Sequence, residues 1–255
     1  MKFIDTHCHL YLPEFKTDLP DVFHRAGLAG VQKFYLPSID SSVMKDLLAL
    51  EKEYPGKCFA MAGLHPCSVS ANFMQELSQS REFSKKISFI AVGEIGLDFY
   101  WSTEYSKEQY EAFNIQMEWA LESKLPVVIH TRNAMQQTID CVKPFAARGL
   151  KGIFHCFGSS YEDAIQITNM DFYLGIGGVL TYKKSGLDEV VKKIDLRHMV
   201  LETDAPYLTP VPFRGKRNES SYIKIIAEKL ASVKNVSLEK VATITTENAE
   251  KVFGK

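Results

Sequence analysis

The chain has 255 residues, a formal net charge of −1 and 45% hydrophobic residues. Such a charge balance excludes a global attraction to nucleic acid or to an anionic membrane, so any polyanion must be bound by a local patch or by metal ions. The composition is that of a globular protein large enough to fold without disulfides, as one large domain or two small ones.

The five cysteines are odd in number, and none of them forms a CxxC pair. They therefore indicate reduced thiols in a reducing compartment. The N-terminal segment lacks the apolar stretch of a signal peptide, and no run of ~18 apolar residues could span a membrane. We expect a cytoplasmic protein with no membrane contact and no obligate protein partner.

Short apolar runs recur along the chain at regular intervals and without polar alternation. Such runs suit strands that are covered on both faces, as in a parallel sheet. The eight runs are 3–4, 34–36, 59–62, 89–92, 127–129, 152–154, 172–174 and 199–201.

Helical patterns fill the gaps between these runs, clearly over 110–124, 223–233 and 238–252 and more weakly over 163–170. Ser237 is a plausible N-cap of the last helix and Gly254 a stop. Alternating strands and helices indicate βαβ units, and eight repeats favour closure into a barrel over an open sheet. We predict an α/β fold, a single (β/α)8 TIM barrel over residues 1–255, with an extra C-terminal helix.

Imidazoles and carboxylates stand where several predicted strands end, and the active sites of such barrels are assembled at that face. His7 and His9 are two residues apart on one strand and share a face. A lone histidine at a strand end is more often a hydrogen-bonded core residue, but several together favour a metal site. The six candidate ligands are His7, His9, Glu94, His130, His155 and Asp204.

The carboxylates leave several roles open. Glu94 could bridge two cations or form a salt bridge with a barrel lysine or arginine, because burying it unpaired would be costly. Asp204 could bind metal, accept a proton from water, or do both, or it could be a turn residue before Pro206. Asp5, Asp98 and Glu202 are candidates for orienting the ligands, Asp98 also for capping a loop.

Four histidines and two carboxylates exceed what one tetrahedral zinc needs. We therefore predict two divalent ions that share Glu94, with Zn, Mn or Mg as the candidate metals. His65 and Arg132 could bind a phosphate. The basic run 214–217 would lie on the rim of the barrel mouth, where it could meet a nucleic-acid backbone.

The motifs together resemble the TatD family of metal-dependent deoxyribonucleases, within the amidohydrolase-like barrels. The resemblance extends over almost the whole chain, and the segments that carry it are 5–10, 63–66, 93–98, 129–132, 155–157, 201–208 and 212–219. It implies a barrel fold and a cytoplasmic 3′→5′ exonuclease that acts on DNA, with RNA as a further candidate.

The resemblance also implies how the site is divided. One ion would be held by His7, His9, Glu94 and Asp204, and the other by Glu94, His130 and His155. It places His65 and Arg132 near the scissile phosphate. The sequence departs from the family pattern at Cys67, Asn133 and 158–159, which spares the predicted ligands but bears on substrate preference.

Three hypotheses follow for the function. The leading one is a two-metal phosphodiesterase with Glu94 and Asp204 as catalytic residues, in which Asp204 orients the attacking water and accepts its proton. The second is a metal-dependent amidohydrolase, lactonase or esterase that acts on a small molecule. The third is a barrel that binds nucleic acid or another partner without catalysis.

Overall fold

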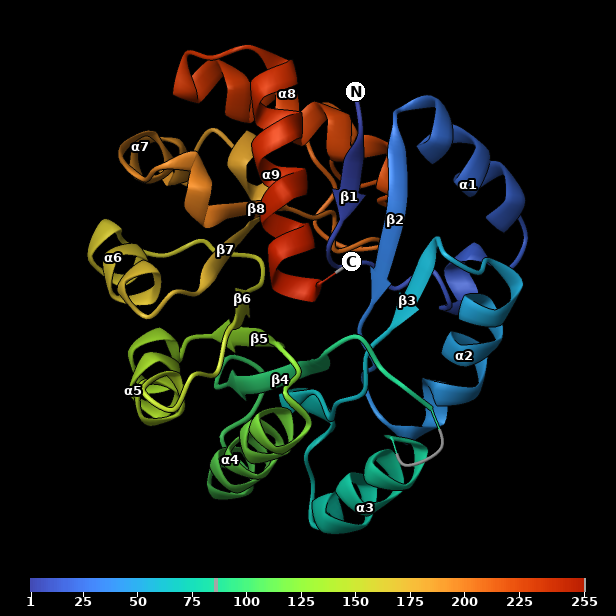
Figure 1. Ribbon diagram of the computed structural model, residues 1–255, viewed down its shortest axis with the longest axis vertical. Helices are drawn as coiled ribbons and strands as arrows, with labels where there is room; N and C mark the ends of the chain where they lie inside the picture. The colour runs from blue at the N-terminus through green and yellow to red at the C-terminus, as the bar shows by residue number, and fades with distance from the viewer. Residues whose placement is uncertain (85–86, 255) are drawn as a thin grey trace.

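The computed structural model describes residues 1–84 and 87–254, and within them eight parallel strands alternate with helices (Figure 1). The strands are β1 (Phe3–Asp5), β2 (Val31–Leu36), β3 (Cys58–Ala60), β4 (Val92–Asp98), β5 (Val127–Arg132), β6 (Gly152–Phe154), β7 (Tyr173–Ile176) and β8 (Met199–Leu201). The α-helices are α1 (Leu19–Leu28), α2 (Met44–Glu53), α3 (Phe73–Ser84), α4 (Ser106–Ser123), α5 (Met135–Ala146), α6 (Tyr161–Asn169), α7 (Leu187–Lys193), α8 (Ile223–Lys234) and α9 (Leu238–Phe253).

The strands form two sheets, which together make the barrel wall. One sheet has the order β1-β2-β3 and the other the order β4-β5-β6-β7-β8. Their edges meet at two isolated parallel bridges, one between Cys8 and Ala205 and one between Ala62 and Val92. The predicted (β/α)8 TIM barrel is therefore confirmed, with two seams where the ladder is reduced to single bridges.

The lower barrel interior is filled by apolar side chains that several strands direct inward, and α9 packs against them. Tyr35 of β2 stacks on Phe253 of α9 with ring centroids 4.0 Å apart. Ile4, Val128 and Val200 belong to the same buried cluster. The extra C-terminal helix thus closes the amino-terminal end of the barrel, and Figure 1 shows it crossing in front of the strands.

The predicted ends of this last helix are confirmed. The Ser237 side chain accepts a hydrogen bond from the amide of Lys240 at 3.1 Å, as an N-cap does. Gly254 ends the helix with φ = 69°, in the left-handed region that favours glycine.

One predicted strand lies too early in the sequence. The run 89–92 was expected to form the fourth strand, but β4 begins at Val92 and continues to Asp98. Phe89, Ile90 and Ala91 are buried just before the strand begins, and the amide of Ile90 donates to the Ala60 carbonyl of β3. The pairing with β5 extends through polar residues to Asp98 and Arg132, so the end of the apolar run does not mark the end of the strand.

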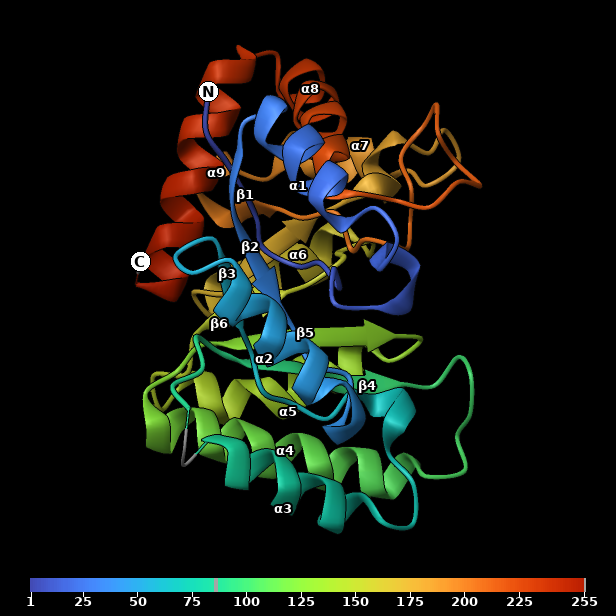
Figure 2. The same ribbon diagram turned by 90° about the vertical axis from the view of Figure 1, so that its right-hand side faces the viewer.

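The loops that follow β4 and β8 project from the molecule on the side opposite α9 (Figure 2). This side is the carboxyl-terminal mouth of the barrel. Among the described residues no helix is long and apolar enough to cross a membrane.

Candidate metal centre

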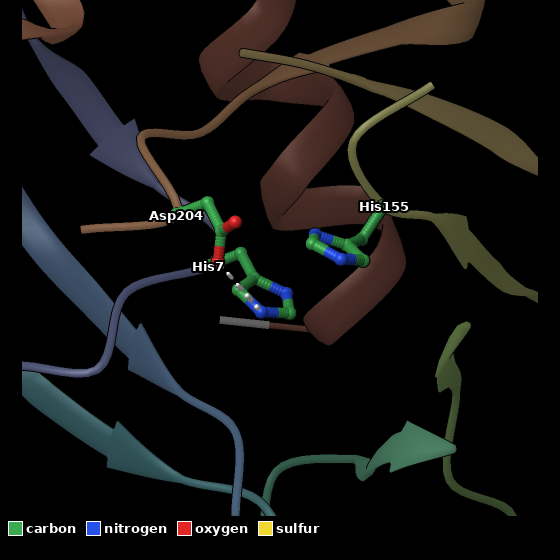
Figure 3. Close-up of side chains that lie close together, drawn as sticks. All are labelled: His7, His155 and Asp204. Atoms are coloured by element: carbon green, nitrogen blue, oxygen red, sulfur yellow. Dashed lines mark ion pairs between the residues drawn. The ribbon is translucent and has the colours of Figure 1, made fainter. Parts of the chain in front are cut away.

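The six predicted ligand side chains converge at this mouth, although they come from segments up to 197 residues apart. Nε2 of His7 lies 3.3 Å from Nε2 of His9 and 3.7 Å from Oδ1 of Asp204. Figure 3 shows His7, His155 and Asp204 around a common centre, with the His7 and His155 rings stacked at 3.8 Å.

Glu94 lies in the middle of this group, and its two oxygens face different partners. Oε2 is 3.1 Å from Nε2 of His7 and 3.8 Å from Nε2 of His9. Oε1 is 2.9 Å from Nδ1 of His130 and 2.9 Å from Nε2 of His155. A carboxylate with this arrangement can bridge two cations, one on each side.

An irregular register directs Glu94 toward the centre. Gly93 pairs with Val128 and Ile95 with Ile129, so Glu94 is an extra residue between two paired ones. Such bulges change the direction of a side chain and often lie beside active sites. The centre therefore depends on a local departure from regular strand pairing.

The outer nitrogens of three imidazoles lie beside oxygen atoms. Nδ1 of His9 is 2.9 Å from the hydroxyl of Tyr11, and that hydroxyl donates to the Pro37 carbonyl at 2.7 Å. Nε2 of His130 is 2.8 Å from Asp98 Oδ2, and Nδ1 of His155 is 3.3 Å from Glu202 Oε1.

In the neutral rings, such outer acceptors favour the tautomer that carries its hydrogen on the outer nitrogen. The inner nitrogens of His9, His130 and His155 then carry lone pairs that point to the centre. Metal-binding histidines are held in this way by carboxylates and other acceptors. The donor set and its orientation therefore fit divalent cations, with Glu94 between two groups of ligands.

The charges of the centre are strongly coupled. Burial alone would raise the pKa of Glu94, but His155 and His7 bring it well below its usual range. Burial alone would lower the pKa of His155, but Glu94 and Glu202 raise it well above the ordinary value. Burial alone would also lower the pKa of His130, but the contacts with Asp98 and Glu94 outweigh this effect and raise it. Protons on these imidazoles would occupy the place that a cation takes.

His65 lies at the edge of the centre, with Nε2 3.6 Å from Oε1 of Glu94. Its Nδ1 accepts a hydrogen bond from the amide of Cys67 at 3.0 Å. The neutral ring therefore carries its hydrogen on Nε2 and presents a donor toward the centre. This arrangement suits an anionic oxygen better than a cation, although His65, Glu94 and His130 lie close enough to hold a metal ion.

Arg132 lies on the rim, at the end of β5, with its guanidinium 3.7 Å from the ring centre of Tyr100. It is exposed and does not join the group of carboxylates and imidazoles. In the basic run, Arg217 pairs with Asp18 at 2.7 Å and is thereby tied to the start of α1, whereas Arg214 lies over the Tyr182 ring. Arg217 is thus a structural residue.

The proposed supporting carboxylates divide into two kinds. Asp98 and Glu202 each contact an imidazole of the centre, as described above. Asp5 accepts hydrogen bonds from the amide and the hydroxyl of Thr203 at 2.9 and 2.6 Å, and from the backbone amide of His7 at 3.5 Å. It connects the first strand to the segment after the last one and contacts His7 through the backbone, so its role in orienting that histidine stays a prediction.

Sequence reasoning missed three residues at the mouth: Tyr11, which contacts His9, and the aromatic pair Tyr100 and Trp101 after β4. Tyr11 follows His9 by two residues and so shares its side of an extended segment. The aromatic pair directly follows a strand that ends in a polar residue, and this position was a usable signal.

Comparisons with known proteins agree with this geometry. The model of the family described as TatD related DNase matches residues 4–254. YabD of Bacillus subtilis strain 168, named as a metal-dependent hydrolase, is 38% identical over 98% of both chains. The protein named 3′-5′ ssDNA/RNA exonuclease TatD from Yersinia pseudotuberculosis is 30% identical over 98% of both chains. The crystal structure of the TatD homologue YjjV from Escherichia coli K12 has a TM-score of 0.92 at 28% identity, over 99% of this chain and 98% of that one.

The chain thus belongs to the TatD family of metal-dependent hydrolases. The resemblance drawn from the sequence motifs is confirmed at this level.

Proposed function

We propose that the protein is a two-metal phosphodiesterase that removes nucleotides from the 3′ end of DNA, or of RNA. The observation that carries this proposal is the position of Glu94, whose two oxygens face two separate groups of imidazoles. His7, His9 and Asp204 would hold one ion with Glu94, and His130 and His155 the other. Paired divalent ions activate water and stabilise the attacking and leaving oxygens of a phosphodiester.

The protein side chains have distinct roles in this reaction. Asp204 is the partly exposed carboxylate of the centre, with 13% of its side chain accessible, and it accepts the proton of the attacking water. The Nε2 hydrogen of His65 donates to a phosphate oxygen. Arg132, as a cation on the rim, pairs with the phosphate backbone of the incoming strand.

The main alternative is an amidohydrolase, lactonase or esterase of the same family of barrels, in which the cations polarise a carbonyl. The donor Nε2 of His65 and the exposed guanidinium of Arg132 favour a phosphate over a neutral ester. The relative from Yersinia pseudotuberculosis, named as an exonuclease, also supports the nuclease.

Single-stranded DNA labelled at its 5′ end tests the proposal, with Mg²⁺, Mn²⁺ or Zn²⁺ added to the purified protein. We expect a ladder of progressively shorter labelled products that disappears when EDTA is added. Asp204→Asn should slow the reaction by about 10²–10⁴-fold, the usual contribution of a general base.

Asp140→Asn is the matched control, because Asp140 is an exposed carboxylate on α5 whose side chain pairs with Lys143 and Gln136 at the surface. It should leave the rate unchanged. Full activity of Asp204→Asn would remove that residue from the reaction. Intact DNA together with turnover of a lactone or an ester would favour the alternative.

A further inference from the structure

The loop that follows β4 places two large aromatic side chains on the barrel mouth. Trp101 is 70% exposed and Tyr100 is 51% exposed, and their rings meet edge to face with centroids 4.9 Å apart. The guanidinium of Arg132 lies 3.7 Å from the centre of the Tyr100 ring and 5.2 Å from that of Trp101. An exposed apolar patch with a polar rim often marks a binding site.

A single carboxylate connects this aromatic pair to the metal centre. Oδ1 of Asp98 accepts hydrogen bonds from the amides of Tyr100 and Trp101, at 2.9 and 3.3 Å. Oδ2 of the same carboxylate lies 2.8 Å from Nε2 of His130. The aromatic pair is therefore held in a fixed place beside an imidazole of the centre.

The segment that follows His65 lies beside the aromatic pair. Pro66 and Cys67 line a small pocket together with Trp101 and Asp98. Trp101 therefore lies beside the segment that follows His65, and its ring is 5.2 Å from the guanidinium of Arg132, two residues after His130 in β5. A group bound on this ring would be adjacent to a phosphate held at the centre.

Arg132 adds a charge that has no counterion among residues 1–84 and 87–254. It forms no ion pair with the described part of the chain, and its contacts there are with the two aromatic rings. An aromatic ring beside an unpaired guanidinium matches a nucleotide, which carries a flat base and an anionic phosphate.

We propose that Trp101, held by Asp98 and flanked by Tyr100 and Arg132, stacks on an unpaired base of the strand whose phosphate lies at the metal centre. The proposal rests on the proposed nuclease function and specifies its substrate as a strand end with a free base. In a duplex the base is paired and stacked on its neighbours, so its face is not available to the ring. The aromatic pair would therefore select unpaired ends.

Two oligodeoxynucleotides test this role, one with ordinary nucleotides at its 3′ end and one with abasic residues there. The measured quantity is the ratio of kcat/KM for the ordinary end to kcat/KM for the abasic end. Trp101→Leu keeps an apolar side chain but has no ring, and should lower this ratio by about 5- to 150-fold, the range for losing one stacked base. Trp101→Phe keeps a ring and should retain most of the ratio. An equal ratio in the wild type and in Trp101→Leu would overturn the proposal.

A binding measurement separates this proposal from the nuclease itself. The chain has two tryptophans, so Trp119→Phe leaves Trp101 as the only indole. With EDTA present, the ordinary oligonucleotide should quench the fluorescence of Trp101 and the abasic one should not. Quenching together with no cleavage under any of the cations would support the stacking role and contradict the proposed nuclease function. Cleavage without quenching would contradict the stacking role and leave the proposed nuclease function in place.

Discussion

At the scale of single residues, the centre is a set of buried carboxylates and imidazoles that stabilise one another's charged forms. Glu94 and His155 each shift the pKa of the other in the direction that favours an ion pair. Without a cation, the proton on His155 neutralises part of the negative charge of the carboxylates. A divalent ion must displace that proton, because an imidazole binds a metal through its neutral form.

Metal uptake should therefore depend on pH. The pKa values of His130 and His155 are raised in the metal-free protein, so these rings keep their protons to higher pH than usual and bind a cation better as pH increases. We expect the apparent Kd for Mn²⁺ or Zn²⁺ to fall up to about tenfold per pH unit for each proton displaced, between about pH 6 and about pH 8.

Calorimetric titrations in two buffers with different protonation enthalpies would count the protons released. Net release near neutral pH is the expected result. Binding that releases no proton and is equally tight at both ends of this range would contradict the assigned protonation.

At the scale of elements, α9 completes the barrel by covering its amino-terminal end. Phe253 is 5% exposed and stacks on Tyr35, and Ala249 is buried in the same cluster. Closure by a helix removes apolar side chains of several strands from water at once.

Phe253→Ala should lower the free energy of unfolding by about 3–5 kcal/mol, because it leaves a cavity against a packed barrel interior. Urea denaturation would measure this change. Glu247→Ala, on the exposed face of the same helix, is the control and should stay within about 0.5 kcal/mol of the wild type. Equal stability of the two variants would mean that α9 does not seal the barrel.

The order of strands and helices could be predicted from the sequence because each follows from a local period of apolar residues. The bulge at Glu94 could not, because it arises from pairing with Val128 and Ile129, which lie in another part of the sequence. The bond from Thr203 to Asp5 and the pairing of Arg217 with Asp18 are equally non-local. The site residues were identifiable by type and position, whereas the contacts that orient them required the fold.

At the scale of the whole molecule, the centre lies where the two sheets meet. Cys8 and Ala205, in one isolated bridge, each adjoin predicted ligands, and Val92 of the other bridge lies two residues before Glu94. His7 and His9 follow β1, which belongs to the three-stranded sheet. The other four side chains belong to or follow strands of the five-stranded sheet. Bound cations would therefore fasten the two sheets together.

Divalent cations should accordingly stabilise the folded protein. At a free concentration about 100 times Kd the gain is about 2.7 kcal/mol, which corresponds to a rise in Tm of about 5–10 °C for a chain of this size. Differential scanning calorimetry with Mn²⁺ and with EDTA would measure it. His155→Asn should reduce the rise, and an undiminished rise in that variant would place the bound cation elsewhere.

The centre takes side chains from both the beginning and the far part of the chain, since His7 must meet Asp204. During synthesis, the segment after the eighth strand must leave the ribosome before all six proposed ligands can come together. Until then the early histidines are exposed without their partners, and a chain interrupted before residue 204 would lack one of the proposed ligands. The chain would thus gain the ability to bind both ions late in its synthesis, and binding of both ions would indicate that the barrel is complete.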